Sequence, residues 1–182
     1  MPRFIAFLRA INVGGRVVKM EYLRKIFESL GFFNVRTFIA SGNLVFGARE
    51  RKTGTLEQKI EKALHEALGY EVATFIRTEK ELLEIAHYSP FAQAVLEAAR
   101  ALNILFLAEP LAESSRENLI ALKTESDDFH VNGREVYWLT RRKFSESQIA
   151  GEVNKILKKR FTSRGANTVK QLASKYCLPG KS

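Results

Sequence analysis

The order of the apolar patterns over residues 3–77 is the feature that most constrains the fold of this chain. Strand-like apolar runs end at a Gly-Gly break, at a Ser-Gly-Asn turn or at polar loops, and two amphipathic helical segments lie among them. The resulting order is β-α-β-β-α-β, which is that of a split βαβ, or ferredoxin-like, module. We therefore predict that residues 1–78 form one ferredoxin-like module of the α+β class.

The second half of the chain, residues 79–182, predicts a variant of the same module. A strand over residues 103–110, a helix and a hairpin around Asn132-Gly133 give the order β-α-β-β. The next helical segment places its apolar residues at Ile149, Val153, Ile156, Leu157 and Phe161. We thus predict βαββα with flanking helices, and extra C-terminal helices where a fourth strand would complete the module.

Composition places the chain among ordinary globular proteins. Hydrophobic residues make up 46% of the 182 residues and charged residues 27%. No apolar run approaches the roughly 20 residues that span a membrane, so we expect no membrane association. Residues 1–10 are typical of a strand and not of a signal peptide, and Cys177 is the only cysteine. These features predict a cytoplasmic protein without disulfides.

The basic charge is concentrated at the C-terminal end. The chain carries a net charge of +9, and residues 134–182 hold 12 of its 29 basic residues but only 3 of its 20 acidic ones. This asymmetry favours an anionic partner, with nucleic acid as the leading class, although a plain solvated surface has the same composition. The candidate nucleic-acid contacts are Arg141, Arg142, Lys143, Lys155, Lys158, Lys159 and Arg164.

The predicted topology brings two polar loops of the first module together. In a split βαβ unit the third strand lies between the first two, so the loop after the first strand and the Ser-Gly-Asn turn share one end of the sheet. Backbone amides at Gly-Gly and at the following helix N-terminus favour an anion there. The candidate ligand-binding residues are Arg9, Asn12, Gly14, Gly15, Lys19, Ser41, Gly42 and Asn43. The alternative is that these residue types only satisfy turn geometry.

Known catalytic motifs are absent from the sequence. It has no Walker A loop, no G-x-G-x-x-G, no G-x-S-x-G and no H-E-x-x-H. The histidines His65, His87 and His130 have no companions at metal-ligand spacing, so we predict no metal and no cofactor. The β-α-β-β-α-β order also occurs in RNA-recognition modules, but residues 41–48 lack their aromatic signature.

Two stretches point to a family. "LRAINVGGRVVKMEYLRKIFESLGFFNVRTFIASGNLVF" contains R-x-I-N-V-G-G and S-G-N, and it closely resembles the opening of a family of small, mostly bacterial proteins known only as a domain of unknown function, DUF1697. "FTSRGANTVKQL" is similar to that family's T-x-R-N-W-N-T-V-x-K-L ending. The resemblance implies a two-module α+β fold and no assigned activity. Ala10 departs from it by replacing a Gly, and Gly165-Ala166 replace Asn-Trp.

Three functional hypotheses follow, and whether the protein is an enzyme stays open. The first is an anion-binding, and in particular nucleic-acid-binding, protein, which a continuous basic surface from Arg141 to Lys159 would favour. The second is an enzyme acting on a small phosphorylated or carboxylated metabolite, which a pocket lined by Arg9 and Asn43 would favour. The third is a structural or interaction module, which loops filled by their own side chains would favour.

Overall fold

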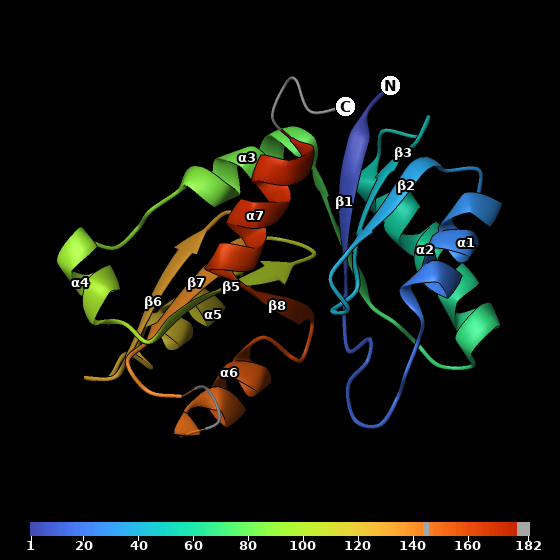
Figure 1. The fold of residues 1–182 in the computed structure, drawn as a ribbon. Helices are drawn as coiled ribbons and strands as arrows, with labels where there is room; N and C mark the ends of the chain where they lie inside the picture. The colour runs from blue at the N-terminus through green and yellow to red at the C-terminus, as the bar shows by residue number, and fades with distance from the viewer. Residues whose placement is uncertain (144–145, 178–182) are drawn as a thin grey trace. The chain divides into compact units, whose positions relative to one another are not determined.

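The structure is a computed structural model that describes residues 1–143 and 146–177. The chain divides into two compact units: Met1–Ala86 together with Gln171–Ser182, and His87–Lys170. Each unit contains one four-stranded antiparallel sheet with helices, so the predicted α+β class with two ferredoxin-like modules is confirmed (Figure 1). Within the described residues, every helix is too short or too polar to cross a membrane.

The first unit follows the split βαβ plan, with its strands in the order β2-β3-β1-β4. β3 and β4 flank β1 on either side and run antiparallel to it. A capping box joins β4 to α3: Thr78 Oγ1 accepts from the Glu81 amide, and a Glu81 carboxylate oxygen accepts from the Thr78 amide at 2.7 Å. The elements are β1 (Arg3–Leu8), α1 (Met20–Ser29), β2 (Phe33–Phe38), β3 (Asn43–Gly47), α2 (Thr53–Leu68), β4 (Thr74–Thr78) and α3 (Glu79–His87).

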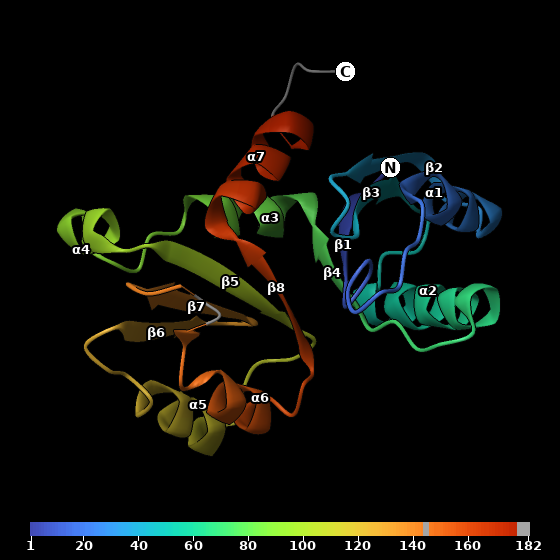
Figure 2. The ribbon, with the colours of Figure 1, turned by 60° about the horizontal axis from the view of Figure 1, so that its bottom comes forward.

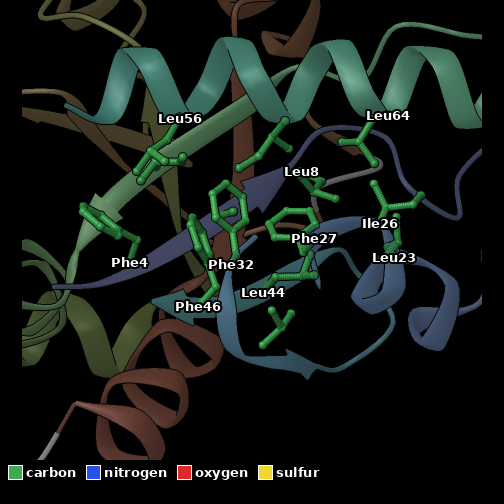
Figure 3. Close-up of a cluster of buried hydrophobic side chains, with 14 of the residues drawn as sticks. Phe4, Leu8, Leu23, Ile26, Phe27, Phe32, Leu44, Phe46, Leu56 and Leu64 are labelled. Carbon is green, nitrogen blue, oxygen red and sulfur yellow. The ribbon is translucent and has the colours of Figure 1, made fainter. Parts of the chain in front are cut away.

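The core of this unit lies between the sheet and helices α1 and α2, as Figure 3 shows. Strand alternation sends Phe4, Ala6 and Leu8 of β1 into this core. The intervening residues Ile5 and Phe7 are also fully buried, so the other face of β1 offers no exposed ring for base stacking. The helices contribute Leu23, Ile26, Phe27, Leu56, Ile60 and Leu64.

The second unit repeats the same sheet plan, with its strands in the order β6-β7-β5-β8. Helices α5 and α6 lie on one face of this sheet in Figure 2, and their Leu119 and Val153 pack with Phe129 and Trp138 in its core. The predicted hairpin around Asn132-Gly133 is confirmed. The remaining elements along the chain are α4 (Gln93–Ala98), β5 (Ala101–Leu107), α5 (Glu113–Ile120), β6 (Asp127–Asn132), β7 (Glu135–Thr140), α6 (Ala150–Ile156), β8 (Phe161–Gly165) and α7 (Ala166–Tyr176). The first residues of α7 belong to the second unit and those from Gln171 to the first.

The fourth strand of the second module, β8, was not predicted from the sequence. The prediction of one helix through Phe161 is wrong, because α6 ends at Ile156 and Phe161 begins β8 beside β5. Its sequence, FTSRG, lacks apolar alternation, because the buried positions are Thr162 and Arg164. The polar face of β8 is therefore turned inward, which hydrophobic periodicity does not reveal.

Candidate functional site

Two loops of the first unit meet at one end of its sheet. Residues 9–19 follow β1, and residues 39–42 join β2 to β3. The Leu8 amide donates to the Gly42 carbonyl oxygen at 2.9 Å, which holds the two loops against each other. Their proximity is the one that the split topology predicted. We call residues 9–19 and 39–42 the corner.

The side chain of Asn12 ties the two loops of the corner together. Its Nδ2 donates to the Ala40 carbonyl oxygen at 3.0 Å, and its Oδ1 accepts from the Val18 amide. Asn12 itself has φ +58°, a left-handed conformation that Asn adopts more readily than most residues. The amide group of Asn12 is thus engaged within the corner on both its oxygen and its nitrogen.

The Ser-Gly-Asn turn is also held by its own groups. Asn43 is fully buried, and its Nδ2 donates to the Phe38 carbonyl oxygen at 3.0 Å and to Ser41 Oγ at 2.9 Å. Gly42, between them, has φ +77°. These contacts satisfy polar groups within the turn itself.

The Gly-Gly segment leads the chain into α1 without a side-chain cap. Gly14 and Gly15 are exposed with φ +66° and +82°, and a Cβ on either would meet nothing within 4 Å. Arg16 places its guanidinium 4.1 Å from the centre of the Tyr70 ring, a cation–π contact that fixes the loop. Lys19 occupies the N-cap position with no side-chain hydrogen bond to the helix, and it is exposed.

Exposed apolar side chains are the feature of the corner that sequence reasoning missed. Val13, Val17 and Ile39 are 61%, 86% and 52% exposed. Ile39 also has φ +50°, which is unusual for a β-branched residue. A signal for two of them was present, because Val13 and Val17 fall in a Gly-rich loop with no helical or strand period to bury them. The exposure of Ile39 depends on the conformation of its turn, for which the sequence contains no signal.

Arg9 belongs to a surface depression that none of the other candidates lines. Its side chain lines a depression of about 630 Å³ with α2, and Asn43 is not part of that depression. Partial burial lowers the pKa of the Arg9 guanidinium from its usual value. The further lining residues are Ala10, Gln58, Glu61, Lys62, His65, Glu71, Val72 and Ala73. Among the residues that the structure describes, no three His, Cys, Asp or Glu side chains come together to hold a metal ion.

The candidate cations of the second unit fall at two ends of its sheet. Arg141, Arg142 and Lys143 follow β7 at the end where β5 begins, whereas Lys158 and Lys159 precede β8 at the end where β5 finishes. Since β5 has 7 residues, the two groups lie on the order of 20 Å apart along the strands. These positions do not by themselves form one continuous basic surface.

The two remaining candidate cations are engaged within the protein. Arg164 is buried in β8, where its Nη1 donates to Thr162 Oγ1 and to the Ser163 carbonyl oxygen, both at 2.8 Å. Burial lowers the pKa of Arg164 to about 10. Lys155 pairs with Glu152 at 2.6 Å on the surface of α6. The geometry thus separates Arg164 from the exposed cations.

Fold and site together define a two-module α+β protein with a loop corner held by its own hydrogen bonds. The chain belongs to the family described as "Protein of unknown function (DUF1697)", whose model matches residues 1–137. Its structure is similar to that of the conserved bacterial protein SP0830 from Streptococcus pneumoniae, with a TM-score of 0.77, 21% identity and coverage of 96% of this chain and 97% of that one. That likeness supports the fold alone. No curated protein matches the sequence.

Proposed function

We propose that this protein is a non-catalytic binding module whose corner receives an acidic, amphipathic segment of a protein partner. The observation that carries the proposal is the exposure of Val13, Val17 and Ile39 on two loops that Asn12 ties together. Exposed apolar side chains gathered on neighbouring loops are typical of protein-binding surfaces. The corner is held in place before binding, which lowers the conformational entropy that association costs.

The charge around the corner indicates the chemistry of the partner. Residues 9–19 contain Arg9, Arg16 and Lys19 and no acidic residue. Cations beside apolar side chains favour a segment that carries both acidic and apolar residues, because each kind of group then meets its complement. A peptide with acidic residues alone would leave the apolar side chains in water.

The alternative of an enzyme acting on a small metabolite has less support. The Asn12 and Asn43 amides are engaged in the hydrogen bonds of the corner, and Ser41 Oγ accepts from Asn43. The depression beside Arg9 carries Glu61 and Glu71 as well as Lys62, so its lining does not concentrate positive charge for an anion. For these reasons we place the binding site at the exposed apolar side chains.

The proposal is tested with a panel of fluorescent peptides of equal length. One set alternates Glu with Leu, a second replaces Leu by Ser, and a third replaces Glu by Lys. We expect the Glu/Leu set to bind, and Val17→Ser with Ile39→Asn to weaken that binding by about tenfold through the loss of two apolar contacts. Asn is chosen at position 39 because it tolerates the left-handed backbone.

The matched control is Ile120→Asn, which removes another exposed apolar side chain on the second unit. It should leave the peptide affinity unchanged. Equal binding of the Glu/Ser set would favour simple anion binding over the proposal. Equal affinity of the corner variant and the parent protein, or no binding of any Glu/Leu peptide, would refute it.

A further inference from the structure

We infer that the turn Lys158–Lys159–Arg160 of the second unit binds the phosphate backbone of single-stranded nucleic acid. This surface is distinct from the corner, and the inference does not rest on the proposed function. All three side chains are exposed, and within the described residues none of them forms an ion pair. Three consecutive unpaired cations provide the electrostatic contacts that a row of phosphates requires.

The backbone of this turn is a Schellman motif in which lysines occupy positions that favour glycine. Lys159 N–H donates to the Asn154 carbonyl oxygen at 3.0 Å, and Lys158 N–H to that of Lys155 at 3.2 Å. Lys158 and Lys159 have φ +52° and +56°, left-handed values that strain any residue with a Cβ. Cations after a helix complement its dipole, but this screened attraction is smaller than the strain of two left-handed residues. Folded-state stability alone does not explain the two lysines.

The turn of residues 158–160 lies at the end of the sheet where β5 finishes. Leu107 at the end of β5 lies between Phe161 of β8 and Arg134, whose carbonyl oxygen accepts from the Leu107 amide at 2.9 Å. The Arg134 guanidinium reaches the Ala108 carbonyl oxygen at 3.4 Å and so lies at the same end of the sheet. The end of the sheet that precedes β8 thus carries residues 158–160 together with the β6–β7 turn.

The chemistry of this surface favours a phosphate backbone over an acidic protein. Protein interfaces have an apolar centre surrounded by polar groups. Residues 158–160 contain no apolar side chain, whereas binding to phosphates is electrostatic and needs none. A flexible single strand is favoured over a duplex because one short turn contacts only a few neighbouring phosphates.

The decisive variant is Lys158→Gly with Lys159→Gly, because it should change stability and binding in opposite directions. Glycine relieves the left-handed strain, so the melting temperature should rise. Two phosphate contacts are lost, so affinity for a fluorescent oligothymidylate should fall. With about three phosphate contacts in the parent protein and about one in the variant, each adding about 0.7 to the salt slope, a rise from about 50 to 200 mM salt should lower the affinity about 20-fold and about threefold, respectively.

Two controls separate the site from general effects. Ala10→Gly relieves left-handed strain in the first unit without changing charge, so it should raise the melting temperature and leave oligonucleotide affinity unchanged. Lys62→Gln with Lys80→Gln removes two exposed positive charges elsewhere and should change affinity less than twofold.

Three results would overturn the inference. The first is unchanged oligonucleotide affinity in the glycine variant, and the second is an equal loss in the variant that lacks Lys62 and Lys80. The third is equal binding of polyglutamate or of tripolyphosphate at matched charge, which would assign the turn to acidic proteins or to free polyphosphate. Stronger binding of the oligonucleotide than of either competitor supports it.

Discussion

At the scale of single residues, left-handed backbone conformations account for several residue types in the corner. Ala10, Asn12 and Ile39 adopt positive φ there, in addition to its glycines. Ala10 has φ +55°, a conformation that Gly would adopt without strain.

Ala10→Gly should therefore stabilise the protein. A left-handed Ala costs about 1–2 kcal/mol, and the greater freedom of Gly in the unfolded chain offsets about 0.4–1 kcal/mol of the relief. The expected net gain in the free energy of unfolding is about 0.5–1 kcal/mol, measured by urea unfolding. A loss of stability would show that Ala10 makes a contact worth more than its strain.

Gly42→Ala should destabilise the protein by more than conformation alone requires. Gly42 has φ +77°, and a Cβ there would lie 3.0 Å from Leu8 Cβ and 3.2 Å from Ile11 Cβ. Strain and crowding together predict a loss of about 2–4 kcal/mol in the free energy of unfolding. Gly14→Ala is the matched control, since a Cβ at Gly14 has open space and should cost only about 1–2 kcal/mol. Equal losses in the two variants would remove the crowding argument.

At the scale of elements, acidic side chains satisfy an outer edge of the first sheet. β4 is an edge strand, and its amides at Thr74 and Ile76 donate to carboxylate oxygens of Glu61 and Glu57, both at 2.8 Å. The two glutamates lie one turn apart on α2. They cover backbone donors that would otherwise be open to another strand, which is a common protection against edge-to-edge association.

Glu57→Ala with Glu61→Ala should cost stability and promote self-association. Each lost acceptor leaves a strand amide without its partner, which predicts about 1–2 kcal/mol per site in the free energy of unfolding. Size-exclusion chromatography with light scattering measures the association. The control replaces both residues by Gln, whose amide oxygen still accepts a hydrogen bond, and it should retain most of the stability. A Gln pair as damaging as the Ala pair would show that charge, and not the covered edge, matters.

The elements were predictable where burial follows a period, and less so where polar residues are buried. The Asn132-Gly133 hairpin and the first module came directly from turn chemistry and apolar alternation. β8 did not, because its inward residues are Thr162 and Arg164. The meeting of the corner loops was predictable from topology, but the exposure of Ile39 depends on a turn conformation that composition does not encode.

At the scale of the whole molecule, one strand order is used twice with different surfaces. Both sheets place the loop after their first strand beside the turn between their second and third strands. In the first unit this end carries exposed valines and Ile39. In the second it carries the exposed cations Lys158 and Lys159. A shared fold with different loop chemistry is how one architecture supports different binding partners.

The first unit is discontinuous in sequence, and this predicts how the molecule unfolds. Residues 171–177 group with Met1–Ala86, and Leu172 and Cys177 are buried. The Tyr176 ring lies edge-on to the Phe38 ring at 6.1 Å, and its carbonyl oxygen accepts from Arg3. The folding of the first unit should therefore depend on residues 171–177, which are far from residues 1–86 in the sequence.

Leu172→Ala should lower the stability of the first unit by about 2–5 kcal/mol, because it leaves a cavity in a buried site. Trp138 is the only tryptophan and lies in the core of the second unit, so its fluorescence reports that unit while circular dichroism reports both. We expect the dichroism transition to move to lower temperature and to separate from the fluorescence transition.

The Cys177 thiol gives an independent readout of the same event. Burial raises its pKa to about 11, so in the native protein it stays protonated at neutral pH and should react slowly with iodoacetamide. Leu172→Ala should accelerate that reaction, whereas the exposed Ser174→Ala on the same helix should not. If fluorescence and dichroism instead shift together in Leu172→Ala, the two units unfold as one cooperative structure. Residues 171–177 would then stabilise both units and not the first unit alone.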